Sequence, residues 1–130
     1  MKKLFAALTA GFLALTLASC GETAGTGGYT QISAEEAKAL MDSEKDAVIV
    51  DARTEEEYAG GHIPGAVLLP HDRVAEQAEG LLPDKDRLIL VNCRSGRRSN
   101  IAAQALADLG YTQVKEFGGI IDWPYETVTQ

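Results

Sequence analysis

The sequence has few cysteines, few cationic side chains and no apolar run of membrane-spanning length. Two cysteines in 130 residues cannot build a disulfide-rich framework, and no cluster of Cys and His has the spacing of a zinc site. Only 12 Lys and Arg residues stand against 19 Asp and Glu residues, which argues against general nucleic-acid binding. With 45% hydrophobic and 24% charged residues, the composition also excludes collagen-like, disordered and multi-span membrane proteins. It favours a single globular domain.

The first 20 residues have the pattern of an export signal. Lys2 and Lys3 precede an uncharged, mostly apolar run over residues 4–17, which is shorter than the roughly 20 residues that span a bilayer. The run ends in residues 17–20 (LASC), which resemble the lipobox of bacterial lipoproteins. The resemblance implies a signal peptide over residues 1–19, lipid on Cys20, and an extracytoplasmic protein anchored to a bacterial membrane, on the periplasmic side or at the cell surface. A signal peptide without lipid attachment is the alternative.

The remainder of the chain divides into a tether and one folded domain. Residues 20–28 are rich in Gly and Thr and predict a flexible tether, so the domain comprises residues 29–130. Short apolar runs predict strands at residues 47–50, 66–69, 87–92 and 114–117, with a further edge strand at 29–32. Capping residues and apolar periodicity predict helices near residues 34–41, 54–58, 72–80 and 99–109. This alternation indicates an α/β fold with a parallel sheet, in which ligands bind at the carboxyl ends of the strands.

The strand predicted over residues 87–92 is followed by a candidate active-site loop, which consists of Cys93, Arg94, Ser95, Gly96, Arg97, Arg98 and Ser99. The amides of the tight turn and of the helix start that follows form a cradle for an anion. Gly96 allows a backbone conformation that a side chain would forbid. Because cationic and helix-terminal sites favour a thiolate, we expect Cys93 to be a nucleophile. The alternative is an inert buried cysteine at the end of a strand.

Three segments occur in the order and spacing of a known family: residues 50–70 (VDARTEEEYAGGHIPGAVLLP), 90–111 (LVNCRSGRRSNIAAQALADLGY) and 117–124 (FGGIIDWP). They resemble single-domain rhodaneses, which are thiosulfate sulfurtransferase-like proteins. The resemblance implies a five-stranded parallel sheet flanked by helices on both faces, an active-site loop that starts at Cys93, and no cofactor or metal. It further implies that Cys93 takes sulfur from a small anionic donor such as thiosulfate, holds it as a persulfide, and passes it to a thiol, cyanide or a protein acceptor.

Two other functions fit parts of the same pattern. A non-enzymatic module that binds persulfide or polysulfide and relays it to a protein partner would use the same cysteine. An enzyme of the phosphatase or arsenate reductase type needs a C-x5-R loop, which places the arginine at position 99. Ser99 occupies that position and Arg98 makes the spacing C-x4-R. The loop is therefore one residue shorter than a C-x5-R loop. Its amides form a smaller ring, which is expected to fit a sulfur atom better than a tetrahedral phosphate.

The other conspicuous residues are expected to have structural roles. Those that match the first motif of the family are Asp51, Arg53, Glu57, His62 and Gly65. Charge pairs and backbone hydrogen bonds of Asp51 and Arg53 are expected to fix the turn after the strand. His62 is expected to be packed and hydrogen-bonded, with a catalytic role as the alternative, and residues 55–57 are expected to form a solvated helix start. His71 lacks a second ligand at metal-binding spacing. Trp123 and Tyr125 are expected to close over the core, with a place at the rim of the pocket as the alternative.

Overall fold

The computed structural model describes residues 28–129, so the predicted signal peptide and the predicted lipidation site Cys20 lie outside the described residues. The strands are β1 (Thr30–Gln31), β2 (Val48–Asp51), β3 (Val67–Leu68), β4 (Leu88–Cys93) and β5 (Gln113–Gly119). They form one sheet in the order β1-β5-β4-β2-β3, and each pair of neighbouring strands is parallel. The predicted five-stranded parallel sheet is confirmed.

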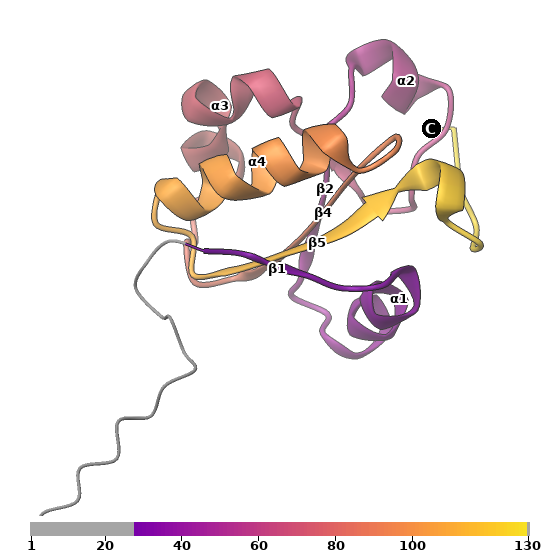
Figure 1. The fold of residues 1–130 in the computed structure, drawn as a ribbon, viewed down its shortest axis with the longest axis horizontal. Coiled ribbons are helices and arrows are strands. Elements are labelled where there is room, and N and C mark those ends of the chain that lie inside the picture. Colours follow the sequence, from indigo (N-terminus) through magenta and orange to yellow (C-terminus); the bar gives the residue numbers. More distant parts are fainter. Residues whose placement is uncertain (1–27, 130) are drawn as a thin grey trace, which may run out of the picture.

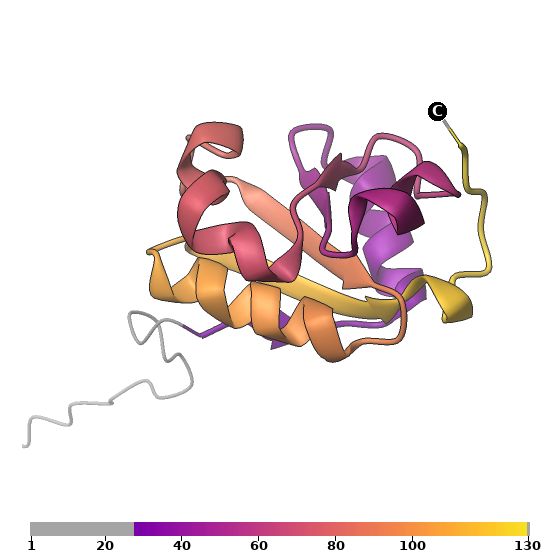
Figure 2. The ribbon, with the colours of Figure 1, turned by 90° about the horizontal axis from the view of Figure 1, so that it is seen from above.

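Helices cover both faces of this sheet (Figures 1 and 2). They are α1 (Ala34–Ser43), α2 (Glu55–Ala59), α3 (Val74–Leu81) and α4 (Arg97–Asp108), with 3-10 turns η1 (His71–Arg73) and η2 (Ile120–Asp122). The α3 and α4 helices pack on one face and α1 packs on the other, whereas α2 lies beside the carboxyl ends of the strands. Among residues 28–129, no helix combines the length and the apolar character needed to cross a membrane.

The central strand β4 directs alternate side chains to the two faces of the sheet. Ile89 and Val91 pack in the core beneath α3 and α4, whereas Leu90 packs on the opposite face with Phe117. All three β4 side chains are fully buried, as expected for a parallel strand covered on both sides. Cys93 belongs to the same cluster as Val91. The alternation of the strand therefore places its sulfur beneath α4.

The two helix starts predicted from capping pairs have the expected geometry. At α1, the Ser33 side chain accepts from the Glu36 N–H while the Glu36 carboxylate accepts from the Ser33 N–H. Thr54 and Glu57 exchange the same two hydrogen bonds at α2. The second pair also fixes the Glu57 side chain, which takes part in the site described below.

Two of the predicted boundaries that differ in the structure lie beside Cys93. The α4 helix begins at Arg97 and not at Ser99, because Gly96 adopts φ 110° and turns the chain directly into the helix. Strand β5 continues past Phe117 to Gly119, because Gly119 pairs with Cys93 across a register shift. Both changes extend regular structure up to the loop and so restrict its conformation.

Candidate active site

Cys93 ends β4 with its sulfur beneath the first turn of α4. The residue is 1% exposed, and the Gly96 N–H donates a hydrogen bond to Sγ with an N–S distance of 2.9 Å. Figure 1 shows this loop at the same edge of the sheet as α2 and the carboxyl end of β5. The Gly96 N–H and the positive end of α4 lie next to the sulfur, which is an arrangement that stabilises an anion there.

Contacts on the outer side of the loop hold the turn in place. The Gly96 carbonyl accepts a hydrogen bond from Nδ2 of Asn100 at 2.7 Å. The Arg94 carbonyl accepts one from the Ile121 N–H at 3.2 Å. A Cβ at Gly119 would lie 2.0 Å from the same Arg94 oxygen, so only glycine allows this close approach. The two carbonyls are thus occupied by other donors, and the Gly96 amide donates to the sulfur.

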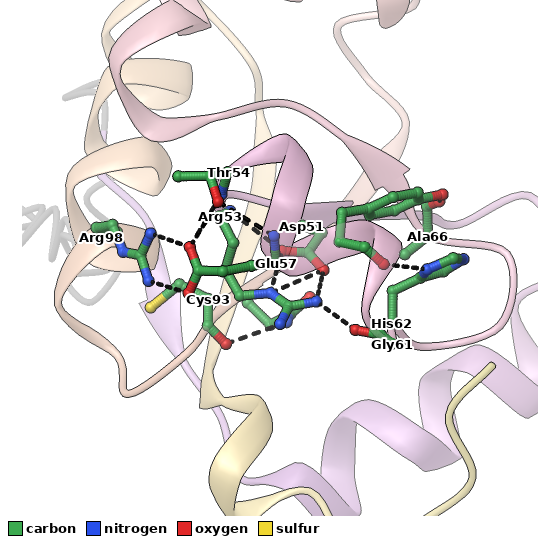
Figure 3. A network of polar contacts seen from close by, with 11 residues as sticks. Asp51, Arg53, Thr54, Glu57, Gly61, His62, Ala66, Cys93 and Arg98 are labelled. Atoms are coloured by element: carbon green, nitrogen blue, oxygen red, sulfur yellow. Dashed lines mark hydrogen bonds and ion pairs between the residues drawn. The ribbon is translucent and has the colours of Figure 1, made fainter. Parts of the chain in front are cut away.

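The arginines of the loop have different surroundings. Arg98 forms two hydrogen bonds with Glu57, at 2.7 and 2.9 Å, and both side chains are partly buried (Figure 3). The Arg98 guanidinium lowers the pKa of Glu57 to about 2, and Glu57 in turn raises the pKa of Arg98. The Arg94 and Arg97 residues are exposed. Arg98 therefore braces the loop against α2, while the side chains of Arg94 and Arg97 form no hydrogen bond or ion pair among the described residues.

The turn that carries Glu57 is fixed by a buried ion pair. Asp51 is fully buried and Arg53 is 6% exposed, and their closest approach is 2.7 Å. Arg53 also donates to the Gly61 carbonyl at 2.7 Å (Figure 3). This hydrogen bond joins the segment before α2 to the segment after it. The Asp51 carboxylate accepts the Arg53 N–H as well. These contacts give both residues a structural function, and they position Glu57 for Arg98.

His62 is also part of the structural framework. It is 3% exposed, its Nδ1 lies 2.8 Å from the Tyr58 carbonyl oxygen, and its ring stacks on the Tyr58 ring with 3.7 Å between centroids. The Tyr58 hydroxyl donates to the Ala66 carbonyl at 2.6 Å. Gly65 adopts φ 84° in the turn before β3, where a side chain would be strained. Figure 3 shows His62 on the side of Asp51 away from Cys93.

Other predicted residues lie further from the sulfur or differ from expectation. The solvated start of α2 is correct for Glu55 and Glu56, which are exposed, but wrong for Glu57, which is paired with Arg98. Trp123 packs at an angle against Phe117, with 5.4 Å between ring centroids. Within residues 28–129, no group of three His, Cys, Asp or Glu side chains is arranged to hold a metal ion.

Two buried side chains lie behind the sulfur: Ser99, which is one of the predicted loop residues, and Glu116, which is not a predicted site residue. Sγ of Cys93 lies 3.3 Å from the Ser99 hydroxyl, and that hydroxyl lies 2.5 Å from Oε2 of Glu116. Oε2 also accepts the Gly118 N–H at 2.9 Å. The sequence predicts a role for the Ser99 amide but none for its hydroxyl. It places Glu116 in the apolar strand predicted over residues 114–117. A carboxylate in a strand expected to be buried on both faces is the signal that would have identified it.

Comparison with known proteins assigns the family. Residues 33–124 match the model of the rhodanese-like domain. The chain belongs to the rhodanese-like family. It is 37% identical over 73 residues to the thiosulfate sulfurtransferase PspE of Escherichia coli strain K12, a match that covers 56% of this chain and 70% of PspE. It is 36% identical over 94 residues to a sulfurtransferase of Allochromatium vinosum, covering 72% of this chain and 86% of that protein.

The fold agrees with solved rhodanese structures. A rhodanese with anions from E. coli superimposes with a TM-score of 0.61 and 33% sequence identity, covering 65% of this chain and 99% of that one. The rhodanese-like domain and the relatives named as sulfurtransferases support sulfurtransferase activity in general.

Proposed function

We propose that this rhodanese-like protein moves sulfane sulfur from an anionic donor such as thiosulfate to a thiophilic acceptor through a persulfide on Cys93. The observation that carries the proposal is the contact between Sγ and the Gly96 N–H at the start of α4. A sulfur anion in this position gains a hydrogen bond and the favourable end of a helix dipole. The names of the sulfurtransferase relatives support the same class of reaction.

The reaction follows from two displacements at sulfur. The Cys93 thiolate attacks the outer sulfur of thiosulfate, the sulfur–sulfur bond of the donor breaks, and sulfite leaves with the bonding electrons. A thiophile such as cyanide or a thiol then attacks the outer sulfur of the persulfide, and Cys93 leaves as a thiolate. Two easier steps replace one direct transfer, which is the advantage of a covalent nucleophile. The loop amides stabilise the charge in both steps.

The exposed Arg94 and Arg97 bring the donor to the loop. The chain as a whole is acidic, with a formal net charge of −7, so an anion is attracted only where cationic side chains are concentrated. Arg98 is held by Glu57, which leaves the two exposed arginines as the cations nearest to bulk solvent on this loop. Pairing of Arg98 with Glu57, together with Ser99 at the sixth position after Cys93, also argues against phosphatase chemistry.

Turnover of thiosulfate and cyanide by the purified full chain tests the proposal. We expect thiocyanate to form with the unmodified chain and with Cys20→Ser, and formation to fall to background with Cys93→Ala. Equal rates with and without the Cys93 sulfur would reject the enzymatic function. Persulfide that forms on Cys93 but transfers to no small thiophile would instead favour a module that relays sulfur to a protein.

The proposal extends to the location of the protein. The lipobox-like residues 17–20 support lipid attachment at Cys20 and anchoring of the domain outside the cytoplasm. Metabolic labelling with a radioactive fatty acid would mark the protein, and Cys20→Ser would abolish the label. Unchanged labelling and unchanged membrane partitioning of Cys20→Ser would contradict the anchor.

A further inference from the structure

A carboxylate without a cation lies behind the nucleophile. Glu116 of β5 is 3% exposed, and its side chain points toward α4, where Oε2 contacts the Ser99 hydroxyl. Within the described residues, no Lys, Arg or His side chain forms an ion pair with it. The other buried carboxylate, Asp51, is by contrast neutralised by Arg53. An ionised group buried in this way is costly unless hydrogen bonds or a proton offset its charge.

Ser99 joins this carboxylate to the reacting sulfur. The Sγ atom of Cys93 donates toward the Ser99 oxygen at 3.3 Å. The Ser99 oxygen lies 2.5 Å from Oε2 of Glu116 and 3.1 Å from the Gly96 carbonyl oxygen, and the nearer carboxylate oxygen is the stronger acceptor for its single proton. Oε2 is an acceptor in this arrangement because it also receives the Gly118 N–H at 2.9 Å. The three side chains are buried and form one continuous path for a proton. Proximity of two acidic groups on such a path makes their ionisation mutually dependent.

We propose that Cys93 and Glu116 share one proton through the Ser99 hydroxyl, so that the sulfur becomes anionic as the Glu116 carboxylate becomes neutral. The S–H bond of Cys93 breaks and its proton passes to the Ser99 oxygen, while the Ser99 proton passes to Glu116. No electron is gained or lost, and the total charge of the three groups is unchanged. After the transfer, the Ser99 hydroxyl donates to the sulfur anion together with the Gly96 N–H. Glu116 is thus a positioning residue that acts through Ser99, and its role in sulfur transfer rests on the function proposed above.

In the part of the chain that the structure describes, no other charged group around this path takes the place of Glu116 as acceptor of the Cys93 proton. Arg98 faces the sulfur from α4 and is held by Glu57, and Asp51 on β2 is held by Arg53. On β5 itself, Lys115 reaches the Thr30 hydroxyl. Further titratable or charged groups lie on the elements around the site. On the side of α4 they are Tyr29 before β1, Arg94 of the loop, Arg97 and Asp108 of α4, Glu55, Glu56 and Tyr58 of α2, His71, Asp72 and Arg73 of η1, and Glu76 and Glu79 of α3. The others are Asp122 of η2 and, on α1 at the opposite face, Glu35, Glu36, Lys38 and Asp42.

Alkylation of Cys93 by iodoacetamide as a function of pH tests the shared proton, because only the thiolate reacts at an appreciable rate. The full chain with Cys20→Ser is used, since Cys93 is then its single cysteine. We expect the rate to rise in two steps separated by a shoulder, because the first of the two protons leaves at a lower pH than the remaining proton, which Cys93 and Glu116 share. In Glu116→Gln we expect a single step and, on the shoulder, alkylation about threefold faster or more, because the competing negative charge is removed.

Ser99→Ala is expected to change the alkylation rate in the direction opposite to that of Glu116→Gln. It removes the hydroxyl that donates to the sulfur anion after proton transfer, so alkylation on the shoulder is expected to be about threefold slower or more. Glu76→Gln, which changes an exposed carboxylate on α3, is the matched control and should keep the two steps. A single step in the parent chain, with the same profile in Glu116→Gln as in the control, would overturn the proposal.

Folding and the proposed function are checked separately. Circular dichroism shows whether each variant folds, and if Glu116→Gln does not, an unchanged profile in Ser99→Ala alone overturns the proposal. Alkylation requires no sulfur donor, so its pH profile does not depend on sulfur transfer. Two steps in a protein that forms no persulfide would reject the proposed function and support the shared proton. Persulfide formation in a protein with a single-step profile would support the proposed function and reject the shared proton.

Discussion

Arg98 and Glu57, which lie 41 residues apart in the sequence, form a two-pronged ion pair that joins the first turn of α4 to α2. The capping hydrogen bonds between Thr54 and Glu57 orient the carboxylate, and the first turn of α4 orients the guanidinium. The pair therefore couples the conformation of the Cys93 loop to the chain segment after β2. Its strength depends on pH in a way that can be measured.

Glu57→Gln is expected to lower the free energy of unfolding by about 1–2 kcal/mol at pH 7, a value reduced for the partial exposure of both side chains. The folded-state pKa of Glu57 is lowered from 4.5 to about 2, chiefly by the hydrogen bonds from Arg98. Its contribution is thus fully present above pH 4.5 and is lost as the pH falls toward 2. Urea unfolding of both proteins at several pH values measures this difference.

The neighbouring substitution Glu56→Gln is the control for the Glu57 prediction. Glu56 is exposed and forms no side-chain hydrogen bond or ion pair among the described residues, so its removal should change stability by less than about 0.5 kcal/mol. A difference between parent and Glu57→Gln that is the same at pH 3 and at pH 7 would show that the ion pair does not contribute as described.

Arg94→Ala and Arg97→Ala are each expected to raise KM for thiosulfate about fivefold with a smaller change in kcat, because long-range attraction acts mainly on binding. Added salt should raise KM of the parent protein and reduce the difference from the variants, since exposed charges are screened. Steady-state kinetics at two ionic strengths measures both effects. Arg87→Ala, an exposed arginine at the amino end of β4, is the control. Equal KM values for Arg94→Ala, Arg97→Ala and this control would remove the arginines from donor binding.

Gly119→Ala is expected to displace the loop that contains Cys93. The added methyl carbon would lie 2.0 Å from the Arg94 carbonyl oxygen, so the backbone must move. We expect a loss of about 1–3 kcal/mol in stability and at least a tenfold loss of sulfurtransferase activity. Gly80→Ala in α3 is the matched control, because no atom lies within 4 Å of its added carbon and alanine favours a helix. Parent-like activity in Gly119→Ala would show that the loop geometry is not required.

Much of the framework is predictable from the sequence because its causes are local. The apolar run of β4 predicts a strand buried on both faces, and the Ser33 and Thr54 capping pairs predict two helix starts. Gly96 after Cys93 predicts a tight turn into a helix. These patterns involve residues within a few positions of each other, and the three-dimensional structure does not need to be known to interpret them.

The parts of the site that could not be predicted depend on contacts between distant segments. The pairing of Arg98 with Glu57 requires the position of α2 relative to α4, which no short motif specifies. The contact between Ser99 and Glu116 requires the register of β5 against β4 and the rotation of α4 about its axis. The sequence therefore predicts Cys93 and its loop, including Arg98 and Ser99, but neither the contacts of these two side chains nor Glu116.

The persulfide on Cys93 is the central claim, and intact-mass spectrometry tests it most directly. The full chain with Cys20→Ser is incubated with thiosulfate without an acceptor, and its mass is compared with that of the same chain carrying Cys93→Ser as well. We predict a gain of one sulfur atom, about 32 Da, with Cys93 present, and loss of that mass on addition of cyanide. No gain with Cys93, or an equal gain in the two proteins, would contradict the account.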